Sequence, residues 1–396
     1  MKLSSRSRKI LNVLGIIFLF GLGIFARSNM SNMNGDVANH FVVWYDFIQS
    51  EGIMKALRYP FSIYTPFYTY LLSLATLTYP YLDKVTAIKL IPVTADVVNV
   101  YLVYKIVRLK YPAGLIPFWA AGAFFCLPTV FVNSAIWGQT DALYTVFLLA
   151  CLYFVLREKP FWGMLAYAFS FAIKLQSIVF APFLIILLLK KRVKWWHFIL
   201  IPIVYVLLCI PVILLGRGKR DVLTIYLGQA DLMPWLSGNA PNLFSFIPDK
   251  YYHPGLYIAL AVAALGIGAW IILTVRSKIP LDRNRLVLIA LVTVALTPFL
   301  LPKMHERYFY SENIFALIAA FFFPEMWFVP IASQVSSLLA YWRYFNDIPS
   351  LTSVYIGAII NTALLTFLLW KQFSPRQEKE DTVLLPNRDL GANNIL

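Results

Sequence analysis

Residues 61–82 read FSIYTPFYTYLLSLATLTYPYL, and the placement of this one segment decides the topology of the whole chain. The segment is apolar and about as long as the 20 residues that a membrane crossing needs. It is also rich in tyrosine, which is enriched at membrane–water interfaces. If the segment crossed the membrane, every later loop would change sides, so the basic residues must decide between the two arrangements.

Lysine and arginine are concentrated in the cytoplasmic loops of membrane proteins. If 61–82 crossed, the basic clusters 105–110 and 190–194 would lie outside. If it does not cross, all the clusters share the cytoplasmic side: 105–110, 157–159, 190–194, 276–278 and the tail from 371 onward. We therefore interpret 61–82 as an interfacial or re-entrant element and place both termini in the cytoplasm.

The composition around this segment identifies the class of protein. The chain has 396 residues, of which 60% are hydrophobic and 13% charged, and its mean hydropathy is +0.70. A soluble protein carries roughly 25% charged residues. The net charge of +15 comes with no nucleic-acid-binding motif, so we assign it to topology and expect no nucleic-acid partner. The sequence predicts an all-α, polytopic transmembrane helical bundle.

We expect about twelve spans in a single domain, 1–375, and a disordered cytoplasmic tail, 376–396. The expected spans are 10–26, 86–108, 114–134, 141–156, 161–174, 177–189, 197–215, 255–275, 286–301, 307–325, 327–345 and 351–371. The first follows Lys2, Arg6, Arg8 and Lys9 as a signal peptide would, but lacks a cleavage signal and is expected to be retained. Two long extracytoplasmic loops result, 27–84 and 216–254, and the first should contain an amphipathic helix over 36–50.

Unusual polar residues gather at the outer membrane face in this topology. Asp36 and His40 open the first long loop, and Asp141 lies in the motif WGQTDA. Further along the chain, Lys174 and Gln176 interrupt an apolar stretch, and His305, Glu306 and Arg307 follow the ninth span. Convergence of ionisable residues from distant segments on one membrane face indicates a functional site.

The two aspartates each have two interpretations. Asp36 and His40 are four residues apart and would share one face of a helix, so Asp36 could be a general base for a hydroxyl or simply an N-cap. Asp141 could cap the fourth span, orient an acceptor, act as a rival base, or hold a divalent cation together with Asp36. Two acids from different loops are a weak metal signal, so no metal is favoured.

Lys174 and Arg307 are the cations expected to meet a phosphate, Lys174 as a point charge and Arg307 as a bidentate fork. Snorkelling to the interface is the alternative for Lys174. Glu306 could orient Arg307 or bind sugar hydroxyls, and His305 could donate to a phosphate or sugar oxygen. Asp96, inside the second span, is expected to be structural and to pair with Asn99 or Lys174.

These motifs resemble the glycosyltransferase-C superfamily, multispanning enzymes that use a sugar carried on a polyprenyl phosphate. The resemblance rests on Asp36 in NGDVANH, the element YPFSIYTPFY (59–68), Asp96, WGQTDA, KLQSIVFAP from Lys174, and HERYFY (305–310). Prokaryotic mannosyltransferase-like members, related to enzymes of GPI-anchor and lipid-linked oligosaccharide assembly, are the most similar. The resemblance also implies that His40, Tyr64, Asp96 and Gln139 support the site.

The resemblance implies an inverting hexosyltransferase at the extracytoplasmic face of a plasma or inner membrane, with Asp36 as base and interfacial helices in the first loop. The donor would be a polyprenyl-phosphate hexose, with mannose favoured over glucose, and the acceptor a lipid-linked saccharide or glycolipid among the membrane lipids. Lys174, Arg307 and His305 would stabilise the leaving phosphate. The family often carries paired acids in its first loop, whereas Gly35 precedes Asp36 here.

Two alternatives stay open at the level of sequence. A lipid-linked sugar transporter would carry polar residues along a pathway through both leaflets, whereas here they cluster on one side. A glycan ligase or oligosaccharyltransferase would be favoured by a large extracytoplasmic domain, and the sequence shows none.

Overall fold

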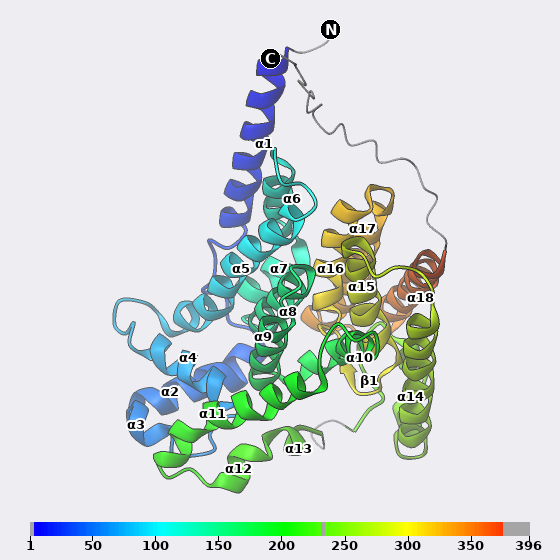
Figure 1. The fold of residues 1–396 in the computed structure, drawn as a ribbon. Helices are drawn as coiled ribbons and strands as arrows, with labels where there is room; N and C mark the ends of the chain where they lie inside the picture. Colours follow the sequence, from blue (N-terminus) through cyan, green and yellow to red (C-terminus); the bar gives the residue numbers. More distant parts are fainter. Residues whose placement is uncertain (1–3, 231–233, 375–396) are drawn as a thin grey trace, which may run out of the picture.

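A computed structural model of the protein describes residues 4–230 and 234–374, and Figure 1 shows that these residues are almost entirely helical. The predicted disordered tail, 376–396, lies outside the described residues. Among the described residues, the strands form a single two-stranded sheet of β1 (Ser237–Gly238) and β2 (Met304–His305).

In the first half of the chain the elements are α1 (Ser5–Phe25), η1 (Val37–Phe41), α2 (Val42–Glu51), α3 (Ile53–Ala56), α4 (Pro66–Thr76), α5 (Lys84–Arg108), α6 (Ile116–Phe125), α7 (Pro128–Phe131), η2 (Val132–Ile136), α8 (Asp141–Leu156), α9 (Pro160–Ile173), η3 (Leu175–Phe180) and α10 (Ala181–Leu189). In the second half they are η4 (Trp195–Ile199), α11 (Leu200–Leu214), α12 (Lys219–Leu223), α13 (Ile225–Ala230), η5 (Leu243–Phe246), η6 (Asp249–Tyr251), α14 (Tyr252–Arg276), α15 (Arg283–Leu300), α16 (Tyr310–Phe322), η7 (Pro324–Met326), α17 (Phe328–Phe345) and α18 (Thr352–Phe373).

Six of the described helical segments are long and apolar enough to cross a membrane: α1, α5, η4 with α11, η6 with α14, α15 and α18. A seventh is a pair bent by 47°, α6 with α7 and η2. Each expected span coincides with a helix, but α8, α9, η3 with α10, and α16 are shorter apolar helices of 10–17 residues. A polytopic helical membrane protein is therefore confirmed, and the number of twelve crossings stays a prediction.

The segment 61–82 forms α4, which is 11 residues long. At a rise of about 1.5 Å per residue it spans roughly 16 Å, about half the hydrocarbon thickness of a bilayer. Pro66 starts the helix at a position where its missing N–H costs nothing. α4 packs against α2, α5, α9 and α11. Its length agrees with an interfacial or re-entrant element, and the helix expected over 36–50 is present as η1 and α2.

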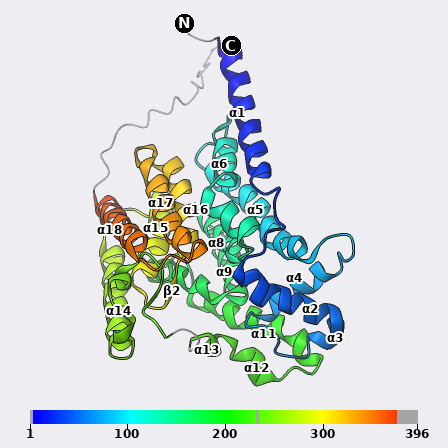
Figure 2. The same ribbon diagram turned by 180° about the vertical axis from the view of Figure 1, so that it is seen from behind.

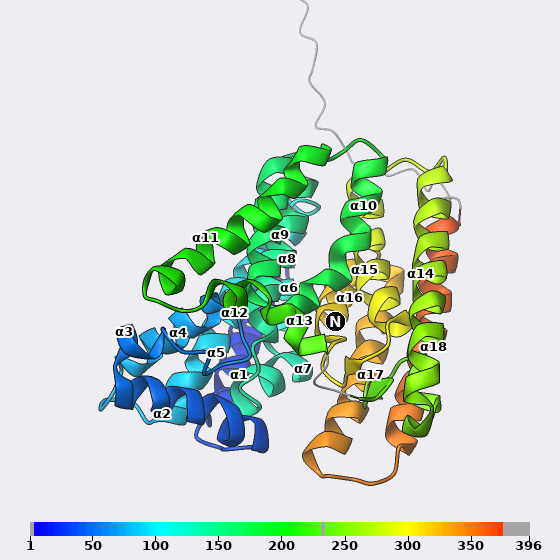
Figure 3. The ribbon, with the colours of Figure 1, turned by 90° about the horizontal axis from the view of Figure 1, so that it is seen from below.

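The helices gather in two groups. In one, α5 packs on α6 and α8, and α8 packs on α9; in the other, α15, α16, α17 and α18 pack on one another with α14 alongside α15 (Figure 2). α16 joins the groups through its contacts with α5, α6 and α8. The view from below shows α2, α3 and α12 near one end of α11 (Figure 3).

The small sheet fixes the loop that follows α15. β1 and β2 pair in parallel, with Ser237 opposite Met304 and Gly238 opposite His305. The amide of Glu306 donates to the carbonyl of Gly238 at 3.0 Å, which continues the pairing beyond the strand. The second long loop, 216–254, therefore holds the segment 305–307 in place.

Candidate active site

A cavity of about 440 Å³ opens where the two long loops meet the segment 305–307. We call it the site cavity. Its lining comes from five separate parts of the chain: Asp36, His40, Phe41, Trp44, Ile63, Tyr64, Gln139, Trp235, Ser237, Gly238, Asn239, Asp249, His305, Glu306, Arg307 and Tyr344. Three of the four polar clusters that the sequence singled out thus contribute to one cavity.

Asp36 directly precedes η1, but its side chain makes no capping hydrogen bond and is held instead by the WGQ turn. Its Oδ2 accepts hydrogen bonds from the indole Nε1 of Trp137 at 2.9 Å and from the amide nitrogen of Gln139 at 2.6 Å. The side chain of Asn34 accepts the hydrogen bond from the amide of Val37. The N-cap interpretation of Asp36 is therefore wrong, and its carboxylate is fixed at the wall of the site cavity.

The WGQ turn owes its shape to Gly138, whose φ of +76° favours glycine. A Cβ on Gly138 would lie 3.1 Å from Val37 and 3.2 Å from Lys89. Lys89 is fully buried, and its ammonium donates to the carbonyls of Asn32 and Ile136. Lys89 thus ties the segment before Asp36 to the turn that holds it. Its sequence signal was the same as that of Lys174, a single lysine in an apolar segment.

Asp141 and Lys174 form a charged pair behind the cavity wall and contact Arg307, which lines the cavity. The ammonium of Lys174 lies 2.6 Å from Oδ1 of Asp141, and Nε of Arg307 lies 3.8 Å from Oδ2. Asn133 donates to the same Oδ2 at 2.9 Å. Because Thr140 occupies the N-cap position of α8, Asp141 is not the cap of that helix. Lys174, expected to reach a phosphate, is buried and contacts a carboxylate instead.

Glu306 and Arg307 face the cavity as an ion pair. Nη1 of Arg307 donates to Glu306 at 2.7 Å, and Nδ1 of His305 lies 3.8 Å from the other carboxylate oxygen. Burial would raise the pKa of Glu306, but His305 and the Arg307 guanidinium outweigh it and hold that pKa below its ordinary value. The guanidinium also lies 5.6 Å from the Trp137 ring centroid, a cation–π contact.

Two more expected residues support this arrangement. Gln176 donates to the hydroxyl of Tyr308 at 2.6 Å, so it braces the segment that carries Arg307. The ring of Tyr64 lines the cavity and lies 5.9 Å from the Lys174 ammonium. His40 also lines the cavity, and its ring lies 5.9 Å from that of Trp44.

Asp96 is structural, but its expected partners were wrong. Its Oδ2 accepts from the Arg27 guanidinium at 2.9 and 3.0 Å and from the hydroxyl of Ser134 at 2.5 Å. Asn99 instead donates to the carbonyl of Ala142. Arg27 and Asp96 are both buried, so this ion pair locks the end of α1 to α5 inside the bundle.

Sequence reasoning missed the aromatic and polar residues that close the cavity, chiefly Trp235, Asn239, Asp249 and Tyr344. Tyr344 stacks on Trp137 with the ring centroids 4.4 Å apart. Arg343 donates to the side chain of Asn239 at 2.6 Å, which ties the second loop to α17. The chain has 11 tryptophans and 23 tyrosines, so their identity alone gave no signal.

Three buried polar atoms of the lining have no hydrogen-bond partner within the described part of the chain: Oε1 of Gln139, Nε1 of Trp235 and Nε of Arg307. Buried polar groups are normally hydrogen-bonded, so the Gln139 and Trp235 atoms are suited to a polar ligand, whereas Nε of Arg307 faces Asp141 at 3.8 Å. Across residues 4–230 and 234–374, no group of three or more His, Cys, Asp or Glu side chains is arranged to hold a metal ion.

The fold and the cavity define a helical membrane protein whose site contains acids, a guanidinium and aromatic rings. Residues 62–302 match Glycosyltransferase family 87, and because this match covers well over half of the 396 residues, the chain belongs to that family. The protein is therefore a membrane glycosyltransferase. The matched range contains Tyr64, Gln139 and Lys174, whereas Asp36 and the segment 305–307 lie outside it. No curated protein matched the chain.

Proposed function

We propose that the protein is an inverting, glycosyltransferase-C-type hexosyltransferase that moves a sugar from a polyprenyl phosphate to a lipid-linked or glycolipid hydroxyl. The site would face the extracytoplasmic side, as the distribution of basic residues predicts. The observation that carries this proposal is a single cavity that brings the Asp36 carboxylate together with the Arg307 guanidinium and the His305 ring. Base and leaving-group stabiliser are the two functions that such a transfer needs.

Asp36 is the proposed general base. Trp137 and Gln139 hold its Oδ2, and we assign proton abstraction to Oδ1. The acceptor O–H bond breaks as its proton passes to Oδ1, and the acceptor oxygen attacks the anomeric carbon opposite the phosphate. The bond from that carbon to the phosphate oxygen breaks, and its electron pair leaves with the polyprenyl phosphate.

Arg307 and His305 are the proposed contacts of the leaving phosphate. Both line the site cavity, and a cation fixed in advance near the developing negative charge stabilises it more than mobile water does. Glu306 holds Arg307 through the 2.7 Å contact, so the guanidinium is oriented before the donor binds. No metal is part of this proposal.

Asp141 and Lys174 are the proposed positioning pair. Asp141 is 0% and Lys174 5% exposed, and their ion pair lies behind Arg307. The pair fixes Arg307 from the side away from the ligand. Asp141 is therefore the less suitable base, since its carboxylate is already held by Lys174, Asn133 and Arg307.

The hexose would bind to the unpartnered lining atoms. Oε1 of Gln139 can accept from a sugar hydroxyl, and Nε1 of Trp235 can donate to one. Mannose is the favoured hexose on the resemblance of the motifs, and glucose is the second candidate.

Transfer from labelled donors tests the proposal. Purified wild type is incubated with polyprenyl-phosphate mannose or glucose and a lipid extract, beside Asp36→Asn, Asp141→Asn and the control Asp46→Asn. Asp46 lies on α2 and is exposed, so its variant should keep full activity. Asp36→Asn should lose about 100-fold or more in kcat.

The outcomes separate the alternatives. If Asp36→Asn keeps full activity and Asp141→Asn loses activity, Asp141 is the general base. If wild type transfers neither sugar but moves labelled lipid-linked sugar across a proteoliposome bilayer, the protein is a transporter and the proposal is wrong.

A further inference from the structure

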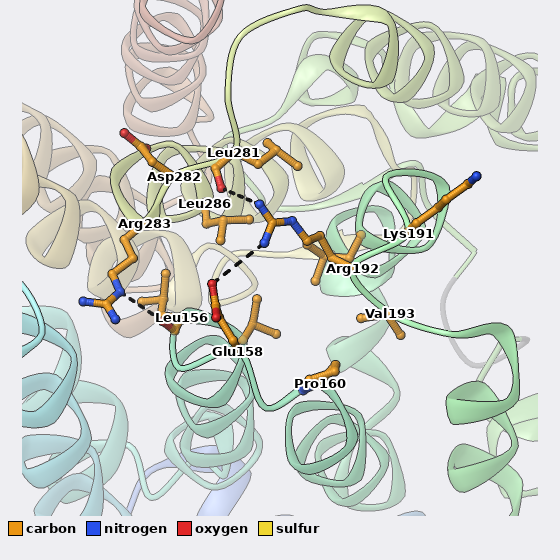
Figure 4. A pocket seen from close by; sticks show the side chains of 12 residues that line it. Leu156, Glu158, Pro160, Lys191, Arg192, Val193, Leu281, Asp282, Arg283 and Leu286 are labelled. Carbon is orange, nitrogen blue, oxygen red and sulfur yellow. Dashed lines mark hydrogen bonds and ion pairs between the residues drawn. The ribbon is translucent and has the colours of Figure 1, made fainter.

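A second cavity, of about 520 Å³, is shown in Figure 4. It lies at the end of α8 opposite to the one that carries Asp141. Asp141 begins α8, whereas Leu156, at the end of α8, lines this second cavity. α8 has 16 residues, so the two regions are separated by roughly 24 Å of helix. We call it the basic cavity, because the three turns that surround it are rich in basic residues. These turns are 157–159, 190–194 and 277–282.

The charge of these turns is strongly positive. The turns 157–159, 190–194 and 277–282 contain seven basic residues and two acidic residues, and Arg283 and Arg285 follow the third turn. Asp282 uses its Oδ1 to accept from the amide of Arg285 at 2.7 Å and so caps α15. Glu158 has a side chain that is 83% exposed and lies 4.0 Å from Arg192, so water screens that pair.

Arg192 brings this charge to the cavity itself. Figure 4 shows the Arg192 guanidinium extending between the carbonyl of Leu281 and the carboxylate of Glu158. Its hydrogen bond to Leu281 is 3.3 Å long, near the upper limit for such a bond. Arg283 donates from Nε to the carbonyl of Leu156 at 3.2 Å. Its Nη1 also donates to the carbonyl of Leu109 at 3.5 Å, and in Figure 4 its guanidinium points away from Arg192. Arg192 is therefore the arginine whose remaining N–H groups an anion in the cavity could bind.

The rest of the cavity places it at a membrane–water boundary. Val155, Leu187 and Leu286 supply an apolar wall. Trp162 and Trp195 begin the helices that follow two of the surrounding turns, and they are 51% and 70% exposed. Exposed tryptophans mark the headgroup level of a membrane. A cationic rim above an apolar wall at this level matches a lipid headgroup rather than a soluble anion.

We propose that the basic cavity binds the phosphate of an anionic phospholipid, with Arg192 as its contact, Arg283 as a nearby charge and the acyl chains beside the apolar wall. Basic pockets between helix ends attract anionic headgroups, and each additional cation near the surface strengthens that attraction. This site does not depend on the proposed transfer reaction, because it shares no residue with the site cavity.

Binding is measured on the full-length protein in detergent by native mass spectrometry, with phosphatidylglycerol and phosphatidylcholine titrated separately. Wild type should retain phosphatidylglycerol in preference to phosphatidylcholine. Arg192→Gln should weaken the binding of phosphatidylglycerol about fivefold. The double variant Arg192→Gln with Arg283→Gln should weaken this binding further. Lys278→Gln is the matched control, because it removes an exposed charge from the same end outside the cavity lining.

Three results would overturn the proposal. One is an equal loss in Lys278→Gln and Arg192→Gln, which indicates diffuse surface charge. Another is equal affinity for the two lipids. The third is full displacement of the lipid by an equal concentration of glycerol phosphate, which indicates a soluble ligand. Arg283 also holds the end of α8, so the double variant could fail to fold. In that case the single variant Arg192→Gln decides the test.

Discussion

The ammonium of Lys174 lies 2.6 Å from Oδ1 of Asp141, and both side chains are buried, at 5% and 0% exposure. Lys174 follows the last turn of α9, and Asp141 begins α8, so the contact joins two adjacent helix ends. Arg307 approaches the other carboxylate oxygen at 3.8 Å. The pair is thus the point where the α8–α9 hairpin meets the loop that carries the proposed phosphate contacts.

Removing one partner of this pair should destabilise the protein strongly. Lys174→Met leaves Asp141 as a buried charge that has lost its closest cation, which costs about 3–5 kcal/mol in buried ion pairs. The double variant Lys174→Met with Asp141→Asn should lose less stability than the sum of the losses of the two single variants, because no unpaired charge remains. Thermal unfolding of the purified variants in detergent measures both effects.

The pair Lys84–Asp46 is the matched control. Its atoms are 2.7 Å apart, but the side chains are 43% and 52% exposed. Exposed pairs contribute about 0–1 kcal/mol, so Lys84→Met should barely change the unfolding temperature. Equal shifts for Lys84→Met and Lys174→Met would show that burial does not distinguish the two pairs.

Gly138→Ala should destabilise the WGQ turn. At φ of +76°, a Cβ adds backbone strain of about 1–2 kcal/mol and must also displace Val37, which lies 3.1 Å away. Thermal unfolding should show the loss, and transfer should fall with it because Val37 follows the proposed base. Gly268, in α14, has open space at its Cβ position, so Gly268→Ala should leave stability unchanged or raise it.

Trp137→Phe tests how Asp36 is held. Phenylalanine keeps an aromatic ring beside Tyr344 but removes the Nε1 donor 2.9 Å from Asp36. A hydrogen bond to a charged group contributes about 1.5–3 kcal/mol, so kcat should fall about tenfold or more while donor KM changes little. Steady-state transfer kinetics separate the two parameters, and an unchanged kcat would remove Trp137 from the positioning of the base. Trp162→Phe, at the opposite end of the bundle, should retain full activity.

The clusters of the site could be predicted from sequence because a charge inside an apolar stretch is costly and therefore conspicuous. That reasoning singled out Lys174, which lies behind the cavity, whereas Asp36 and the segment 305–307, which line it, were singled out by their places beside predicted spans. It could not assign partners, because pairing depends on how helix ends meet in space. Asp96 shows this: its partner Arg27 lies just past the end of α1, at a position that the sequence assigned to a loop.

The aromatic half of the cavity was beyond sequence reasoning for a different reason. Trp235 reaches the site because β1 pairs with β2, and a two-residue strand has no detectable periodicity. Tyr344 lies near the end of α17, among many aromatic residues that contact lipid or core. Only the three-dimensional fold distinguishes these two rings from the others.

Chelation of divalent ions should leave transfer unchanged. In the proposed mechanism, the positive charge near the leaving phosphate comes from Arg307, which Glu306 fixes at 2.7 Å. Initial rates with and without EDTA, on protein freed of metal by prior dialysis, measure the effect. Loss of transfer with EDTA and its recovery with Mg²⁺ or Mn²⁺ would instead assign the carboxylates of the cavity to a metal.

Glu306 should make stability depend on acid pH in a defined direction. Its folded-state pKa is lowered, with burial opposed by His305 and Arg307, so it lies below the unfolded value of about 4.3. The ionised carboxylate therefore stabilises the fold fully above the unfolded pKa, and this contribution is lost as pH falls through the folded pKa. The gap in unfolding temperature between wild type and Glu306→Gln should stay constant from about pH 8 to 5.5 and narrow toward about pH 3.5. The side chain of Glu158 is 83% exposed, so the difference in unfolding temperature between wild type and Glu158→Gln should be small at every pH. A Glu306→Gln gap that stays constant or widens below about pH 4 would show that the pKa of Glu306 is not lowered in the folded protein.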